Sequence, residues 1–324
     1  MAQNNRFIPP FFLKNSHIQS VLNSVGPRKI RANRLAKRLN SEILILEARD
    51  GTRLLGKYDR SQTPNKSVVV LLHGWEGSSE SAYQVTTANY LLKQGFDVLR
   101  LNLRDHGDSH HLNRELFNST MTDEVAGALE CFFDLHHHDK RFLAGFSLGG
   151  NFTLRIACDH GQALALTAAA AICPPVDPTN AMQALDDTWF VYHRYFFHRW
   201  SRSLRKKLIH FPEHGYGTFL DTARTLADMN QFFISNHTPF DDEESYFRSY
   251  SLTGDRLAAL EIPACLISSE DDPIIPVEDL KKINRPQQLS FDTQQFGGHC
   301  GFIKNVSAHS WVENRLSEWF SGYL

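Results

Sequence analysis

The sequence predicts an α/β fold with a mostly parallel central sheet, helices on both faces of the sheet and an inserted helical cap. Three observations predict it. Short apolar segments alternate with segments of helical spacing along most of the 324 residues, which is the pattern of parallel strands joined by helices. The alternation stops between residues 177 and 255 and then resumes. One serine, Ser147, lies at the junction of a predicted strand and a predicted helix.

The chain is expected to begin with an N-terminal arm, residues 1–40, that precedes the sheet. Asn15 or Ser16 can cap a short helix that continues to Val25, and Gly26-Pro27 would end this helix.

The first part of the core is predicted in residues 41–176. Strands at 43–48 and 53–58 form a hairpin, because Asp50-Gly51 is a strong turn signal. The run 67–72 is continuously apolar, as in a parallel strand buried on both faces. The elements that follow are a helix at 81–94, a strand at 96–103, a helix at 122–135, a strand at 140–146, a helix at 151–160 and a buried strand at 163–173.

Residues 177–255 contain no clear strand and are interpreted as a helical cap inserted over the carboxyl edge of the sheet. They are dense in aromatic side chains, namely Trp189, Phe190, Tyr192, Tyr195, Phe196, Phe197 and Trp200. These rings could line an apolar substrate pocket, although most of them are expected to bury the cap against the core.

The second part of the core is predicted in residues 256–324. Its elements are a strand at 263–269, a helix that ends near residue 283, a strand at 288–296 and a terminal helix at 307–320. The terminal helix has apolar residues at helical spacing and should pack on the sheet.

Two basic stretches interrupt this pattern. Residues 28–38 carry six Lys/Arg, and residues 199–207 carry five. Either stretch could bind an anionic or membrane surface. A solvated edge or loop is the favoured interpretation of residues 28–38, and a solvated helix face is favoured for residues 199–207.

Composition and charge restrict the possible partners. The formal net charge is −2 and 42% of the residues are hydrophobic, which indicates a globular protein and argues against nucleic acid as a partner. Five dispersed cysteines without a C-x-x-C motif predict reduced thiols and a cytoplasmic location. No secretory signal is recognised, and the longest apolar run, residues 163–173, is too short to span a bilayer. Peripheral membrane contact remains open.

The serine at the strand–helix junction belongs to a G-x-S-x-G motif, Gly145 to Gly149. A sharp turn from strand to helix brings neighbouring backbone close, so side chains at both glycine positions would clash. The turn exposes the serine hydroxyl, and the first N–H groups of the helix point toward the reacting centre.

Three reactive residues, Ser147, Asp272 and His299, each follow a predicted strand. The carboxyl ends of parallel strands share one edge of a sheet, so these loops should meet. Ser147 would be the nucleophile, His299 its general base, and Asp272 the carboxylate that orients the imidazole. Asp271 is adjacent to Asp272, and chemistry alone does not exclude it.

A tetrahedral intermediate needs hydrogen-bond donors for its oxyanion. The backbone N–H groups of Leu148, just after the serine, and of Trp75, after His73-Gly74, are the predicted donors.

No cofactor or metal site is predicted. His136 to His138 and the run from Asp105 to His111 lack metal-ligand spacing on a rigid element, and exposed loops are favoured there. No G-x-G-x-x-G or P-loop motif follows a strand, so no nucleotide cofactor is expected.

The chain resembles the α/β-hydrolases over nearly its whole length, in particular the branch of bacterial esterases and yeast medium-chain acyl-CoA:ethanol O-acyltransferases. The resemblance implies the triad Ser147, Asp272 and His299, and it favours the second aspartate of the pair. The segments that carry it are Pro9-Pro10, Asn15 to Gln19, His73 to Ser79, Gly145 to Asn151, Asp271 to Pro273 and Gly298 to Phe302. Trp75 stands where the branch often has leucine. His17 receives no catalytic role and is interpreted as a structural residue at a helix start.

The leading functional hypothesis is a serine carboxylic-ester hydrolase that acts through an acyl-enzyme on esters with an apolar, short- to medium-chain acyl group. An acyl-CoA:alcohol O-acyltransferase would use the same triad, with an acyl thioester as substrate. A non-catalytic binding module on the same fold is the third hypothesis.

Overall fold

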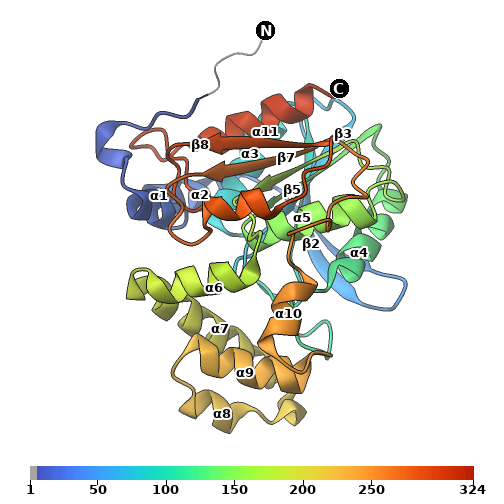
Figure 1. The fold of residues 1–324 in the computed structure, drawn as a ribbon. Coiled ribbons are helices and arrows are strands. Elements are labelled where there is room, and N and C mark those ends of the chain that lie inside the picture. Colours follow the sequence, from blue (N-terminus) through green and yellow to red (C-terminus); the bar gives the residue numbers. More distant parts are fainter. Residues whose placement is uncertain (1–5) are drawn as a thin grey trace.

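The computed structural model describes residues 6–324, so the first five residues of the predicted arm lie outside the description. Its centre is an eight-stranded sheet in the order β1-β2-β4-β3-β5-β6-β7-β8 (Figure 1). The first three strands in this order pair antiparallel, and all later neighbours pair parallel. The strands are β1 (Glu42–Glu47), β2 (Arg53–Asp59), β3 (Ser67–Leu72), β4 (Asp97–Leu101), β5 (Lys140–Phe146), β6 (Ala168–Ile172), β7 (Ala264–Ser269) and β8 (Leu289–Gln294).

Helices cover both faces of this sheet, which confirms the predicted α/β-hydrolase architecture. One face carries α4 (Thr122–Leu135) and α5 (Leu148–Asp159), and the other carries α3 (Ala82–Lys93) and α11 (Trp311–Ser321). Successive residues of β3 point to opposite faces: Val68 packs in the α4/α5 layer and Val69 in the α3/α11 layer. Every residue of β3 is buried, which explains why the strand shows no alternation of apolar and polar residues after Ser67.

Several predicted boundaries were wrong at strand and helix ends. The buried strand predicted at 163–173 is shorter, because residues 160–166 form a turn closed by the bond from the Leu166 N–H to the Gly161 carbonyl. The helix predicted before residue 283 is the 3₁₀-helix η3 (Val277–Lys282). The terminal helix begins only at Trp311, where the Ser310 side chain caps it.

The arm contains η1 (Phe11–Leu13), α1 (Ser16–Leu22) and α2 (Pro27–Ala36). Asn15 caps α1 as predicted, since its side chain accepts a hydrogen bond from the Ile18 N–H. The prediction for Gly26-Pro27 was wrong: this pair starts α2, because proline suits the first turn of a helix. The basic stretch 28–38 therefore lies largely on a helix and not on a loop.

One arginine of this stretch is buried and not solvated. Arg28 is 1% exposed, and its Nη2 lies 3.2 Å from the Glu313 carboxylate of α11. This ion pair attaches α2 to the terminal helix. The Asn23 side chain accepts a second bond from the same guanidinium.

The insertion, residues 177–255, is helical and lies between β6 and β7 in the sequence. Figure 1 shows its helices gathered beneath the sheet, on the side of the carboxyl ends of the parallel strands. Its elements are α6 (Pro178–Asp187), α7 (Phe190–His210), η2 (Pro212–His214), α8 (Gly217–Thr222), α9 (Leu226–His237) and α10 (Glu243–Ser249). Among residues 6–324, no helix has both the length and the apolar character required to cross a membrane.

Candidate active site

Ser147 lies on the strained turn between β5 and α5. Its φ of 53° and ψ of −123° are unusual for a residue other than glycine. The turn is held by the Ser147 N–H, which donates to the Ile172 carbonyl over 2.8 Å. The hydroxyl therefore lies at the carboxyl edge of the sheet and at the start of a helix, as the motif predicts.

The two glycines of the motif are required by backbone contacts. A Cβ on Gly145 would overlap the carbonyl of Gly149, and a Cβ on Gly149 would overlap the carbonyl of His73. Both obstacles are backbone atoms, which cannot rotate away. This confirms the expectation that side chains at these positions would clash.

The structure brings together the three side chains predicted to react. The His299 Nε2 lies 2.9 Å from the Ser147 Oγ, and the His299 Nδ1 lies 2.9 Å from the Asp272 Oδ2. The other oxygen of Asp272 accepts the N–H groups of Ile274 and Ile275. Asp272 is thus fixed in place, as an orienting carboxylate must be.

Asp271 has a different partner. Its Oδ1 accepts the Gly298 N–H over 2.8 Å, so it braces the histidine loop through the backbone. Of the two aspartates that sequence reasoning left open, only Asp272 contacts the imidazole.

Electrostatics at His299 favour the imidazolium. Burial alone would lower the pKa of His299, but the neighbouring Asp272 carboxylate and the Cys300 sulfur together outweigh burial and raise this pKa well above its usual value. The imidazole is therefore a stronger base than a free histidine. An acceptor of the serine proton needs this property.

The arm supports the histidine loop from behind, which sequence reasoning missed. The His299 N–H donates to the Ser20 Oγ over 2.8 Å, and the Ile303 N–H donates to the Gln19 side chain over 2.6 Å. A Cβ on Gly298 or on Gly301 would overlap backbone carbonyls of α1. The sequence held one signal for this contact. The segment Asn15 to Gln19 is part of the family resemblance although none of its residues was predicted to react.

The N–H groups predicted to bind the oxyanion adjoin the serine. A Cβ on Gly74 would lie 3.1 Å from the Ser147 Cβ, so the loop that carries Trp75 touches the nucleophile. Within residues 6–324, neither the Trp75 nor the Leu148 N–H donates to another protein group. Both are therefore available for a ligand.

Neighbouring groups hold the Trp75 loop in place. The Gly74 N–H donates to the Tyr83 hydroxyl over 3.0 Å, and the Glu76 N–H donates to the His106 Nε2 over 3.2 Å. Burial lowers the pKa of His106 to about 4 and that of His73 well below its usual value. Both imidazoles are neutral near pH 7, so His106 can accept the Glu76 N–H.

Two thiols lie beside the catalytic candidate His299, and sequence reasoning missed them as well. The Cys300 Sγ is 4.0 Å from the His299 Nε2, and ligand atoms of Cys173, His299 and Cys300 lie within 4.8 Å of one another. A metal ion on these three groups would compete with Ser147 for the imidazole nitrogen. The five cysteines are free thiols.

The two segments examined for metal binding have other partners. His138 bonds to Tyr58 and Asp97, and His106 bonds to the carbonyl of Arg104 and the N–H of Glu76. The structure thus uses these imidazoles in hydrogen bonds within the core. His106 and His138 are buried, contrary to the exposed loops that the sequence favoured, whereas His111 and His137 are exposed as expected.

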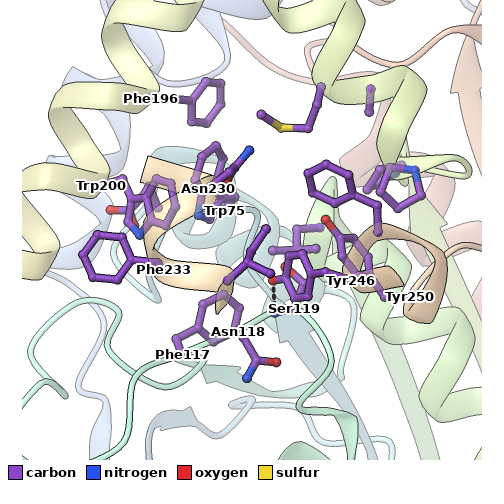
Figure 2. A pocket seen from close by; sticks show the side chains of 18 of the residues that line it. Trp75, Phe117, Asn118, Ser119, Phe196, Trp200, Asn230, Phe233, Tyr246 and Tyr250 are labelled. Carbon is purple, nitrogen blue, oxygen red and sulfur yellow. Dashed lines mark hydrogen bonds between the residues drawn. The ribbon is translucent and has the colours of Figure 1, made fainter. Parts of the chain in front are cut away.

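A pocket opens beside Ser147 between the core and the insertion. Figure 2 shows Trp75, Phe196, Trp200 and Phe233 on one side of it and Tyr246 and Tyr250 on the other. Trp75 stacks on Phe196 at 5.1 Å with an interplanar angle of 9°, and it contacts Trp200 edge-on at 5.4 Å. The pocket is further lined by Leu148, Met182, Leu185, Leu204, Ile274 and Ile275.

The ionisable groups in the pocket wall are largely neutralised. Burial raises the pKa of Glu76 to about 8 although the charge of Arg199 opposes the shift, so this carboxyl is mostly protonated at pH 7. Asp105 is paired with Lys207 at 2.7 Å. The pocket can therefore accept an uncharged, apolar group without leaving a single charge unpaired.

The family model described as "alpha/beta hydrolase fold" matches residues 67–306. The chain belongs to this family. The α/β-hydrolase family assignment agrees with the sheet order, the serine turn and the histidine loop of the structure.

The relatives of this α/β-hydrolase include esterases. The chain is 24% identical over 334 residues to the Escherichia coli (strain K12) protein named "Putative esterase YheT", covering 100% of this chain and 95% of that protein. It is 22% identical over 292 residues to "Medium-chain fatty acid ethyl ester synthase/esterase 2" of Saccharomyces cerevisiae, with 79% of this chain and 62% of the relative covered.

A solved structure shares the fold. The Pyrococcus furiosus esterase Pf2001 superposes with a TM-score of 0.59 at 15% identity, covering 90% of this chain and 95% of the other. This likeness shows the fold, whereas the curated relatives support a hydrolase of the esterase type.

Replacing Gly149 with alanine tests the serine turn. We expect Gly149→Ala to lower the free energy of unfolding by about 2 kcal/mol or more, because the added carbon meets backbone carbonyls of Leu72 and His73. Urea unfolding followed by circular dichroism measures the change. Gly217→Ala is the matched control, because a Cβ there meets only a leucine methyl at 3.7 Å. Equal stability of the two variants would contradict the close approach.

Proposed function

We propose that this protein is a serine carboxylic-ester hydrolase that forms an acyl-enzyme on Ser147. The observation that carries the proposal is the continuous hydrogen-bonded chain from the Ser147 Oγ through the His299 imidazole to the Asp272 carboxylate. A serine hydroxyl is a weak nucleophile near neutral pH. It needs a base in contact with it and a carboxylate that orients that base.

In the proposed acylation step, the Ser147 Oγ attacks the ester carbonyl carbon while the His299 Nε2 takes the serine proton. The N–H groups of Trp75 and Leu148 donate to the resulting oxyanion. Loss of such a donor typically costs about 3–4 kcal/mol of transition-state stabilisation. The imidazolium then gives its proton to the leaving alcohol as the carbon–oxygen bond breaks.

Deacylation uses the same groups in a second cycle. The His299 Nε2 takes a proton from a water molecule, and the hydroxide attacks the acyl carbon. The tetrahedral intermediate collapses to release the carboxylic acid, and Ser147 regains its proton from the imidazolium. Asp272 keeps its charge throughout and stabilises the imidazolium.

We propose that the insertion is a cap that binds the acyl group. Aromatic and aliphatic side chains of α6, α7 and α9 form a wall of the pocket beside Ser147. Such a wall favours an apolar acyl chain, because burial of each methylene contributes about 0.8 kcal/mol. A short- to medium-chain acyl group is the class of substrate we propose.

Removal of the nucleophile tests the mechanism. We expect Ser147→Ala to lower p-nitrophenyl ester turnover about 10⁴-fold or more. A fluorophosphonate probe should label the wild-type protein and a Ser245→Ala control, and it should not label Ser147→Ala. Absence of labelling in the wild-type protein would favour a non-catalytic binding module.

The two neighbouring aspartates form a matched pair for a second test. Asp272→Asn should lower kcat by about 10⁴-fold, because the imidazole loses its orienting carboxylate. Asp271→Asn should keep most activity, because an amide oxygen can still accept the Gly298 N–H. Steady-state kinetics on a soluble ester measures both variants, and equal losses would contradict the assignment.

The pH profile of the same variants tests the electrostatics. The mechanism needs neutral His299, whose pKa is raised by Asp272, so wild-type activity should fall as the pH drops through a value above 6.5. In Asp272→Asn, the carboxylate that contributes most to raising the pKa of His299 is lost, so the acid limb should move to lower pH. An unchanged limb would contradict the role of Asp272.

An acyl-CoA:alcohol acyltransferase is the second candidate function. The relative named ethyl ester synthase/esterase favours it. This reaction would use an acyl-CoA in the acylation step and an alcohol in place of water in the deacylation step. Product analysis with an acyl-CoA in the presence of ethanol separates the two, since faster release of ethyl ester than of free acid would favour acyl transfer.

A further inference from the structure

The charge of the arm differs from that of the rest of the chain. Of the 34 Lys/Arg in the sequence, eight lie in residues 1–41, and this segment contains none of the 36 Asp/Glu. The small net charge of the whole chain is therefore the sum of a basic segment, residues 1–41, and an acidic segment, residues 42–324. Long-range attraction to an anionic surface depends on this local excess and not on the total.

Most of these cations form no ion pair within the described residues, although Arg6 donates to the Gln295 side chain and Lys14 lies over the Phe296 ring. Among residues 6–324, Arg28 and Arg31 pair with Glu313, whereas no ion pair involves Lys14, Lys29, Arg34, Lys37 or Arg38. The basic stretch of α7 behaves differently. Three of its five Lys/Arg, namely Arg205, Lys206 and Lys207, each pair with an aspartate, so more of its charge is compensated.

The arm also exposes large apolar side chains next to these cations. Phe11 is 84% exposed, which is the largest value among the exposed large hydrophobic residues of the described chain. The aliphatic and aromatic residues exposed on the arm are Ile8, Phe11, Phe12, Ile18, Val21, Val25 and Ile30. Such a concentration of apolar surface on one short segment indicates a binding surface.

The insertion extends this surface. The His17 ring lies 6.0 Å from the Trp189 ring, and its Nδ1 lies 3.1 Å from the Tyr192 hydroxyl. Trp189 and its neighbour Phe190 are 50% and 67% exposed. Figure 1 shows α1 and the end of α6 that precedes these rings on the same side of the molecule.

We propose that the arm, together with the start of α7, is a docking surface for an anionic phospholipid bilayer. Apolar side chains of η1 and α1 would enter the boundary between headgroups and acyl chains, and the unpaired Lys/Arg would contact lipid phosphates. A bilayer matches both chemistries at once. Nucleic acid matches the charge and could stack on the exposed aromatic rings, but it offers no apolar surface to the exposed isoleucine and valine side chains.

The proposed docking surface adjoins the candidate active site, because α1 contacts the loop that carries His299. Residues Ser16 to Ser20 of α1 contact the loop of His299, while His17 contacts the cap. A bilayer bound to the outer side of α1 would therefore lie beside the histidine loop and the cap. Esters that partition into lipid would be concentrated next to the pocket.

Vesicle flotation with the full chain tests the proposal. We expect binding to vesicles of phosphatidylcholine with phosphatidylglycerol, weaker binding to phosphatidylcholine alone, and release by salt. Phe11→Ser with Phe12→Ser should reduce the partition coefficient about tenfold, since two inserted rings are lost. Lys29→Glu with Arg34→Glu should reduce it by a similar factor on anionic vesicles only.

Matched controls come from exposed positions elsewhere. Leu135→Ser removes an apolar side chain that is 66% exposed at the end of α4, and Lys93→Glu reverses an exposed charge at the end of α3. Neither should change vesicle binding. Ser147→Ala should bind as the wild-type protein does, so the result does not depend on the proposed catalysis.

Three results would overturn the proposal. One is no binding of the wild-type protein to anionic vesicles, and another is equal binding by the arm variants and the controls. The third is a dimer, seen by sedimentation velocity, that dissociates in the Phe11→Ser/Phe12→Ser variant, because a second copy would then cover this face. Turnover of a soluble ester without vesicles should be unchanged in the arm variants that fold.

Discussion

The imidazole of His299 is the group on which the rest of the site depends. It joins a hydroxyl 152 residues away in the sequence to a carboxylate 27 residues away. Neither bond forms unless the loop after β8 has one conformation. Glycines occupy positions 297, 298 and 301 of that loop, and at positions 298 and 301 the backbone of α1 lies too close for a side chain. Its conformation is set by the backbone of α1, which lies against those glycines.

A similar constraint applies to the opposite side of the serine. The loop after β3 approaches the serine turn closely: a Cβ at position 149 would overlap backbone carbonyls, and a Cβ at position 74 would lie 3.1 Å from the Ser147 Cβ. From the cap, Arg199 donates to the Glu76 carbonyl, and the Phe196 ring stacks on Trp75. The candidate oxyanion donors are thus held by the core from one side and by the cap from the other. The helical insertion thus lines the pocket and also contacts the loop of the candidate oxyanion donor Trp75.

Much of the fold and the site could be predicted from the sequence, because the relevant signals are local. The apolar run of β3, the turn at Asp50-Gly51 and the motif around Ser147 each depend on a few neighbouring residues. The order of the loops along a parallel sheet then places Asp272 and His299 at the same edge. Local chemistry could not decide between Asp271 and Asp272, because the choice depends on which carboxylate the loop turns toward the imidazole.

Other features depend on contacts between distant segments and left no local pattern. The stacking of Phe196 on Trp75 depends on how α7 crosses the core. The thiols of Cys173 and Cys300 meet beside His299 only because two loops converge there. Gly26-Pro27 can either end one helix or start the next, and the sequence around it does not distinguish these cases.

The arm combines the two kinds of constraint. Its inward side is fixed by contacts that only glycine permits on the histidine loop, so it cannot shift without moving His299. Its outward side has exposed apolar side chains and several cations that form no ion pair within the described residues. Because the arm packs against the His299 loop on one side and exposes apolar and basic side chains on the other, binding at the exposed side would act on the loop through α1. A ligand that orders the outer side of α1 would also restrict the loop that carries the proposed general base, which links surface binding to catalysis without any contact between the ligand and Ser147.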